Sequence, residues 1–437
     1  MTRIIDKMLS IMFILAILSI STDAYVPYHE EWNRTFGGAE NSYAYSVEET
    51  QDGGYIVAGS TISNGQDALL IKTYPNGELQ WRRTFGGRYD DQARSVQQTR
   101  DGGFIIAGMI TTSNIRFVRG RESPFGMIIN VKDDLMWLIK TDESGKEQWN
   151  KKFGESGIFG ANSVDQTADG GFILSGMTSP YGVEGPGGAW IIKTDAKGNK
   201  QWDKTIAGDI FGASSAYQTS DGGYIVTGMK PKLVKIDQNG KEEWSKTFQR
   251  KGLDGFSSVQ ETSGGGYVIA GSTQSYGADD GDAWLIKTDT NGNELWNKTY
   301  GKNIDIATSA KQISEGGYII TGWGIVIGTS DEDAWLIKTD ENGNEEWNMT
   351  FAGPRADRIY SIQNTSDGGY ILAGGSESYR TDGSDVWLIK VGNANKTASS
   401  EIVPSNIKPS GKTMSGFEIS LTIFSTLIIF LLKRKKI

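Results

Sequence analysis

Short runs of alternating apolar and polar residues fill the chain between residues 30 and 391, and no apolar repeat of helical period interrupts them. Asp-Gly and Asn-Gly pairs separate the runs, and such pairs favour tight hairpin turns because they adopt positive φ at low cost. The pattern recurs about every fifty residues. Each unit has an aromatic residue after Gly-Gly, at Tyr55, Phe104, Phe172, Tyr224, Tyr267, Tyr318 and Tyr370.

Each unit contains four runs, which we interpret as four strands. The first begins with serine (Ser46, Ser95, Ser163, Ser215, Ser258, Ser309, Ser361) and the second ends at glycine (Gly59, Gly108, Gly176, Gly228, Gly271, Gly322, Gly374). The third ends in lysine (Lys72, Lys140, Lys193, Lys235, Lys287, Lys338, Lys390). An Asp precedes Gly-Gly in five units, and Gly264 and Glu315 replace it in units five and six. Seven such units predict an all-β fold, a seven-bladed β-propeller of four-stranded antiparallel blades over residues 31–391.

The fourth strand carries tryptophan, and its placement predicts how the ring closes. Trp32 opens the mature chain on a fourth-type strand that lacks the first three, while the seventh unit ends at "DVWLIKVG" without a fourth. We therefore expect residues 31–36 to pair with residues 385–391, with Trp32, Phe36 and Trp387 at the junction. Closure removes exposed sheet edges. Serine and glycine are expected where inner strands converge on the axis, and tryptophan where the blades diverge.

Composition excludes several classes of function. The chain has no cysteine and a single histidine, His29, so zinc sites, thiol nucleophiles, disulfides and histidine-based triads are excluded. The formal charge of -9 and the absence of a basic stripe argue against nucleic-acid binding. We assign no catalytic residue, no metal and no cofactor. The 57 glycines against 9 prolines suit many short strands joined by tight turns.

Both ends carry targeting patterns. Residues 1–24 combine basic residues, an apolar run and a small-residue end, which predicts a signal peptide cleaved after Ala24; an uncleaved anchor is the alternative. Residues 392–416 form a polar linker, residues 417–432 an apolar helix and residues 433–437 a basic cytoplasmic tail. The predicted location is the cell surface, with the chain anchored in the membrane and the propeller outside the cell.

The tail "SGFEISLTIFSTLIIFLLKRKK" also resembles the sorting signals of archaeal surface proteins, in which Pro-Gly-Phe precedes an apolar helix. Ser415 stands where that signature has proline. The resemblance implies replacement of the tail by a lipid, so a retained helix and a lipid anchor both stay open. Five sequons are glycosylation candidates of an extracellular protein, at Asn33, Asn297, Asn348, Asn364 and Asn395.

The turns between third and fourth strands carry a further resemblance. "TDENGNEEW" and "TDESGKEQW" resemble the tryptophan-docking repeats of pyrroloquinoline-quinone dehydrogenase propellers and their non-enzymatic relatives, with the Asp-to-Gly interval one residue shorter. The closing strand resembles the ring closure of WD-repeat proteins. Residues 31–391 as a whole resemble the seven-fold surface propellers of archaeal and bacterial secreted proteins. These resemblances imply a fold and a location rather than a reaction.

Two repeated charge patterns each allow two interpretations. The seven lysines either line a polyanion-binding face or lay their stems between blades and meet acids. Acidic clusters before the third strand either bind calcium or cap turns. These clusters are Asp279, Asp280 and Asp282; Asp331, Glu332 and Asp333; and Asp382 and Asp385.

Unit two carries an insertion between its second and third strands, residues 112–133. Arginine beside aromatic residues is typical of interfaces, and ligands of propellers usually lie on a loop-bearing face. The candidate ligand-binding residues are Arg116, Phe117, Arg119, Arg121 and Phe125. A self-packed or disordered loop is the alternative.

The predicted function is a surface binding, adhesion or envelope-structure module, a monomer that recognises an unidentified extracellular protein or glycan. The main alternative is an extracellular enzyme on the same scaffold, either quinone-dependent or acting on carbohydrate. A spacer in the surface layer that binds nothing is a third possibility.

Overall fold

The computed structural model describes residues 28–38, 41–62, 65–118, 127–154, 157–180, 187–206, 212–228, 230–248, 252–276, 281–301, 304–325, 331–380 and 383–393. All regular secondary structure in these ranges is β-strand, and no helix there is long and apolar enough to cross a membrane. The predicted signal peptide (1–24), the apolar helix (417–432), the basic tail (433–437) and all of the linker after residue 393 lie outside the described residues.

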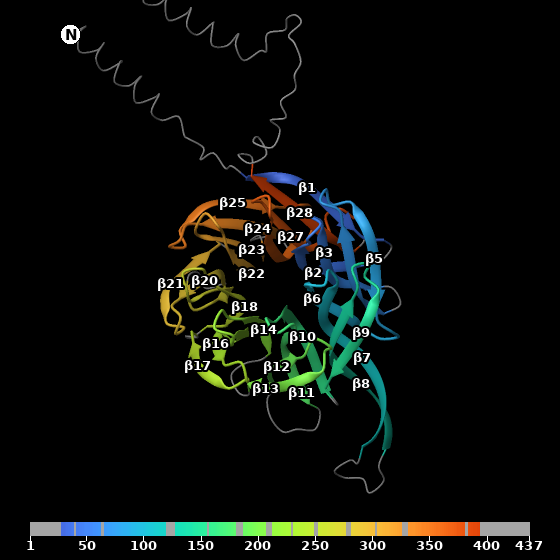
Figure 1. Cartoon of the computed structure of the whole chain (residues 1–437). Coiled ribbons are helices and arrows are strands. Elements are labelled where there is room, and N and C mark those ends of the chain that lie inside the picture. Colours follow the sequence, from blue (N-terminus) through green and yellow to red (C-terminus); the bar gives the residue numbers. More distant parts are fainter. Residues whose placement is uncertain are drawn as a thin grey trace, which may run out of the picture. The chain divides into compact units, whose positions relative to one another are not determined.

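Seven blades of four antiparallel strands surround a common axis (Figure 1). Blade 1 comprises β2 (Ser42–Glu49), β3 (Tyr55–Ile62), β4 (Gln66–Thr73) and β5 (Leu79–Phe85). Blade 2 comprises β6 (Asp91–Gln98), β7 (Phe104–Val118), β8 (Met127–Thr141) and β9 (Glu147–Phe153). Blade 3 comprises β10 (Gly157–Gln166), β11 (Phe172–Pro180), β12 (Gly188–Thr194) and β13 (Lys200–Ile206). The labelled first strands, β2, β6, β10, β14, β18 and β22, lie nearest the axis in their blades (Figure 1).

The other four blades repeat this order. Blade 4 comprises β14 (Ala213–Gln218), β15 (Tyr224–Gly228), β16 (Lys232–Ile236) and β17 (Glu242–Thr247). Blade 5 comprises β18 (Asp254–Glu261), β19 (Tyr267–Thr273), β20 (Asp282–Thr288) and β21 (Glu294–Tyr300). Blade 6 comprises β22 (Ile304–Gln312), β23 (Tyr318–Ile325), β24 (Glu332–Thr339) and β25 (Glu345–Phe351). Blade 7 comprises β26 (Asp357–Asn364), β27 (Tyr370–Ser376), β28 (Asp385–Asn393) and, from the other end of the chain, β1 (Tyr28–Phe36).

The pairing of β1 with β28 joins the two ends of the propeller. The strands are antiparallel, with Phe36 opposite Val386, Thr35 opposite Trp387 and Tyr28 opposite Asn393. The ladder therefore begins three residues before the start expected from the sequence. Trp32 and Phe36 pack on a buried cluster that contains residues of both blade 7 and blade 1.

The blades hold together through apolar clusters at their interfaces. Each outer tryptophan packs on an aromatic residue of the next blade, as Trp81 does on Phe104 with ring centroids 5.9 Å apart. The same indole covers a turn glycine, Gly145, whose φ is +76° and where a Cβ would lie 2.6 Å from the ring. Trp347 instead meets Tyr28, at 5.0 Å, because no turn joins the third and fourth strands of blade 7. The repeated tryptophan and turn glycine therefore pack against each other across the interface between neighbouring blades.

The repeated serines and glycines serve purposes that limited space at the axis does not explain. A serine hydroxyl accepts a hydrogen bond from the first strand of the following blade, as Ser46 does from the Val96 N–H (3.3 Å) and Ser361 from the Val47 N–H (3.3 Å). A bulge in each first strand turns a carbonyl toward the second strand, where a Cβ at Gly59 would overlap the Tyr43 oxygen. The expectation that the second strands end at these glycines is wrong for six blades, because the ladder with the third strand continues past the glycine, as β3 does to Ile62, and only β15 ends on it, at Gly228. The bulge beside each glycine favours a residue without a Cβ.

Candidate functional site

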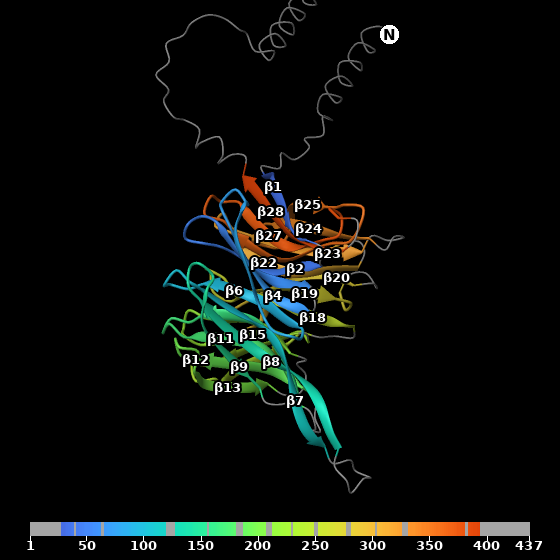
Figure 2. The ribbon, with the colours of Figure 1, turned by 90° about the vertical axis from the view of Figure 1, so that its right-hand side faces the viewer.

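The insertion in blade 2 is a β-hairpin, which we call the arm. Strands β7 and β8 are each 15 residues long and pair without a break to Val118 opposite Met127, so the arm extends beyond the ring (Figure 2). Arg116 lies opposite Ile129 and Phe117 opposite Ile128 in this ladder. Arg119, Arg121 and Phe125 lie outside the described residues. The structure therefore places two of the five candidate residues, both on backbone that leaves the ring.

The base of the arm is tied to two blades. The Thr111 hydroxyl donates to the Asp134 carboxylate at 2.7 Å, and the Thr111 N–H donates to Asp91 at 2.9 Å. Asp134 also forms a parallel bridge with Ile158 of blade 3, which joins blades 2 and 3 into one sheet of eight strands. Met136, the next residue but one, is fully buried. The arm consequently starts from a fixed direction.

Charged residues from three blades meet near the axis, and we call Glu48, Asp165 and Lys311 the axial cluster. Each stands two residues after the repeated serine of its first strand, in blades 1, 3 and 6. The Gln98 N–H donates to Glu48 at 2.6 Å, and the Gln97 amide donates to Asp165 at 3.1 Å. Burial lowers the pKa of Lys311, while Asp165 and Glu48 act against that shift.

The two acids of the axial cluster hold their protons more tightly than exposed carboxyls do. Burial raises the pKa of Glu48 to about 7, and the Gln98 hydrogen bond opposes only part of that effect. Burial also raises the pKa of Asp165, against hydrogen bonds from the Gln218 N–H and Gln97. A carboxyl that titrates near neutral pH can exchange protons there, so Glu48 is a candidate acid at the axis.

The repeated lysines largely meet acids. Lys72, Lys140, Lys193, Lys235 and Lys390 are buried and lie within 2.8–3.0 Å of the Asp that precedes Gly-Gly in the same blade. Lys338 pairs with Glu346 instead. Lys287 has no ion pair among the residues that the structure describes, and it donates to the Gly265 and Thr288 carbonyls at 2.8 Å each. The pairing interpretation is confirmed for six lysines and wrong for Lys287, because both acid positions of blade 5 hold other residues.

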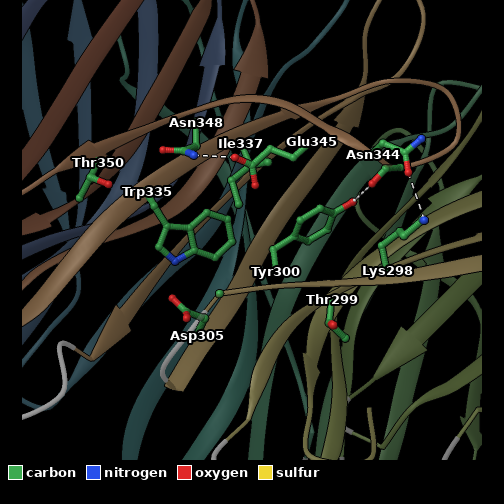
Figure 3. A pocket seen from close by; sticks show the side chains of 12 residues that line it. Lys298, Thr299, Tyr300, Asp305, Trp335, Ile337, Asn344, Glu345, Asn348 and Thr350 are labelled. Carbon is green, nitrogen blue, oxygen red and sulfur yellow. Dashed lines mark hydrogen bonds between the residues drawn. The ribbon is translucent and has the colours of Figure 1, made fainter. Parts of the chain in front are cut away.

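A groove of about 730 Å³ opens between blades 5 and 6 (Figure 3). Trp335 lines it with Tyr300, whose hydroxyl donates to the Gly343 carbonyl at 2.6 Å. The equivalent Trp284 is covered by Phe256 and Tyr276, each with ring centroids 5.3 Å away. No described ring stacks on Trp335 in this way, and its Nε1 has no hydrogen-bond partner. The Trp335 ring is therefore part of the groove wall.

The sequons fall into two structural groups. Asn33, Asn297 and Asn348 stand on fourth strands, and each amide donates at 2.5 Å to a glutamate three residues earlier. Asn364 ends β26 and donates to the Gln312 carbonyl of blade 6 at 2.8 Å. Asn395 lies outside the described residues. Asn348 and Thr350 both line the groove, so a glycan on Asn348 would start at its mouth; glycosylation itself stays a prediction.

The acidic clusters before the third strands contain structural partners where they are described. Glu332 pairs with Arg358, and Asp385 accepts from Arg380 at 3.2 Å. Asp279, Asp280 and Asp382 lie outside the described residues. Within the described ranges no group of three or more acidic or histidine side chains is arranged to hold a metal ion.

Seven blades of four antiparallel strands define a seven-bladed β-propeller with WD40-like structural neighbours. The crystal structure of the WD40 β-propeller domain of Doa1 matches 84% of this chain and 97% of that chain, with a TM-score of 0.52 and 11% identity. A Bacteroides caccae protein of unknown function matches over 72% of this chain and 94% of its own, with a TM-score of 0.41 and 12% identity. No protein-family model and no curated protein sequence matches. The likeness shows the fold alone.

The repeat pattern contains a signal for the axial cluster. The residue two positions after the repeated serine is charged in three units and uncharged in the others, which have Gln97, Tyr217, Gln260 and Gln363. Because these residues occupy the same position on the first strand of their blades, the alignment places the three charges on equivalent inner strands. Nothing in the alignment shows their mutual distances.

Proposed function

We propose that this chain is a secreted binding module, tethered at the cell surface through its C-terminal segment, that presents the arm to an extracellular protein or glycan. The arm carries the proposal, because it is the largest departure from the repeat and extends beyond the ring. In repeat-built folds a specific ligand is recognised where units differ, since identical units offer identical surfaces.

The rest of the ring supports the proposal as a scaffold. The blades are cross-linked by backbone-to-side-chain bonds, including one from the Ser366 N–H of blade 7 to Glu49 of blade 1 at 2.7 Å. The proposal includes the pairing of β1 with β28 as the latch that keeps the ring closed in solution. A closed ring fixes the direction of the arm, and preorganised contact residues lose less entropy on binding.

Removing the arm is the direct test. The arm residues 112–133 are replaced by Asn-Gly, a two-residue hairpin turn that joins Thr111 to Asp134 in the same register. The purified full chain and the variant are passed over immobilised native envelope extract. We expect the variant to keep its melting temperature and to bind at least about tenfold more weakly.

A matched variant separates shape from chemistry. Substituting Arg116, Arg119 and Arg121 with serine leaves the length of the arm unchanged and removes its three arginine charges, while Lys132 is kept. Weaker binding by both variants supports the arm as the contact surface. Unchanged binding after removal of the arm refutes the assignment, and binding by neither variant nor wild type favours the spacer.

The axial cluster favours one second candidate, an extracellular enzyme that acts on carbohydrate. The feature behind it is the burial of Glu48 beside Asp165 and Lys311, which raises the pKa of Glu48 to about 7 and suits a general acid near neutral pH. Glycan hydrolysis by the wild type that is abolished in Glu48→Gln would establish this function. A pKa raised by burial also occurs at structural sites, so the arm remains the favoured candidate.

A further inference from the structure

Blade 5 breaks the rule that every third-strand lysine meets an acid. In blade 1 Lys72 bonds both oxygens of Asp52 at 2.9 Å and the Thr73 carbonyl at 2.9 Å. The other Asp-containing blades repeat the ion pair. A second acid reaches the lysine from the position just before the outer tryptophan in some blades, as Glu243 reaches Lys235 at 3.3 Å. Two positions of the repeat can therefore supply the acid.

Both positions are occupied by residues without charge in blade 5. Gly264 replaces the Asp, and Leu295 replaces the residue before the outer tryptophan, Trp296. Blade 6 also lacks the Asp, but Glu346 compensates. Lys287 thus keeps two carbonyl partners and no carboxylate among the described residues. Desolvation lowers the pKa of Lys287, against the nearby charge of Asp289.

The turn around Gly264 changes with the loss of the carboxylate. In blade 1 the Asp52 carboxylate accepts the Gly54 N–H at 3.1 Å. In blades 5 and 6 the equivalent glycines, Gly266 and Gly317, have φ values of +70° and +81°. The repeated Asp therefore organises the turn as well as the lysine.

Open space remains where the carboxylate is missing. A Cβ built on Gly264 would meet no atom within 4 Å, and the residue is exposed. Leu295 is 61% exposed, which is unusual for leucine beside a half-buried cation. Asp289 does not fill the vacancy, because its carboxylate accepts the N–H groups of Asn291 (2.9 Å) and Asn293 (2.8 Å). Where an Asp-containing blade has an aspartate at the turn position of Asp289, that aspartate likewise does not replace the Asp before Gly-Gly as the partner of the lysine.

We propose that Lys287 and Leu295 form a carboxylate-binding subsite that takes the C-terminal residue of a peptide or protein partner. The partner's carboxylate replaces the missing Asp by accepting from the Lys287 Nζ, and its apolar side chain covers Leu295. A charge-assisted hydrogen bond beside apolar surface recognises an acid attached to an apolar group. The site lies on the face of the 1–2 and 3–4 turns, opposite the arm, so it goes beyond the proposed function.

The test uses N-acetyl-leucine as the probe, with N-acetyl-leucinamide as its uncharged counterpart. Full chain labelled on leucine methyl groups is titrated with each, and the Leu295 methyl resonances are followed by NMR. We expect saturable shifts from the acid and none from the amide. Equal shifts from both, or no shift from the acid, overturn the proposal.

Two charge-matched variants locate the site. Gly264→Asp restores the internal carboxylate and is expected to weaken acid binding at least about tenfold, whereas Ser263→Asp adds the same charge one residue away and weakens it less. Lys287→Met removes the cation and should abolish binding, which decides the matter if Gly264→Asp fails to fold. Retained binding in Lys287→Met or in a folded Gly264→Asp variant refutes the site.

Discussion

Replacing Glu48 by glutamine is expected to stabilise the ring at alkaline pH. Glutamine keeps an oxygen that accepts the Gln98 N–H, which Glu48 binds at 2.6 Å, and removes only the ionisable group. Burial raises the pKa of Glu48 from 4.5 to about 7. Because the folded state holds the proton more tightly than the unfolded chain, the contribution of Glu48 to stability is fully present below pH 4.5 and is lost as the pH rises through 7.

The size of the effect follows from the same two pKa values. Between pH 5 and pH 8 the linkage relation gives a loss of about 2–3 kcal/mol in the free energy of unfolding of the wild type. The Glu48→Gln variant does not suffer this loss. It should therefore match the wild type near pH 4.5 and exceed its free energy of unfolding by about 3 kcal/mol at pH 8.

Urea denaturation at pH 5 and pH 8 measures this difference directly. Glu78→Gln, which removes one charge from an exposed turn, is the charge-matched control. A Glu48→Gln variant that is less stable than wild type at pH 8 would refute the reasoning. That result would mean that Glu48 is ionised in the folded ring and stabilised by Lys311.

Three further expectations concern the frame of the propeller. Trp32→Ala and Trp81→Ala should each lower the free energy of unfolding by about 3 kcal/mol. Only Trp32→Ala should speed amide exchange in β28, which hydrogen-exchange mass spectrometry measures. Equal exchange rates in β28 of the two variants would contradict a latch at β1. Gly59→Ala should lower the melting temperature by an amount equivalent to about 2 kcal/mol or more, since its Cβ overlaps a carbonyl, and an unchanged melting temperature would exclude the bulge as its cause. Burial raises the pKa of Asp169, but hydrogen bonds from Thr167, Lys193 and the Gly171 N–H outweigh it and lower the pKa to about 2. The contribution of Asp169 to stability is therefore present above pH 3.8 and lost as the pH falls through 2. Lys193→Met should reduce the loss of melting temperature between pH 4 and pH 2, and an acid profile identical to that of the wild type would argue against the Lys193–Asp169 ion pair.

The arm shows how much of the candidate site can be predicted from the sequence. Its location in unit two and its arginine and aromatic content follow from reading one repeat against the others. Its extension as a paired hairpin to Val118 and Met127 does not, because the same residues also suit a loop packed on itself. The difference depends on the tie between Thr111, Asp91 and Asp134, and those residues are distant in sequence.

The repeated lysines also show which features the sequence predicts and which need the structure. Pairing with an acid was expected because strand interiors in a propeller are covered on both sides, and the exception at blade 5 was visible in the sequence as Gly264. The sequence does not show that Lys287 lacks a carboxylate partner, since only the structure shows that Leu295 occupies the second acid position and that space remains open around Gly264.

The sequence alone determined the number of blades, the four strands within each and the turns that join them, because alternation and turn chemistry act over about ten residues. The tertiary structure decided which side chains of different blades share a neighbourhood. Glu48, Asp165 and Lys311 come together only when the blades surround one axis. That arrangement depends on packing between all the blades, which no local pattern encodes.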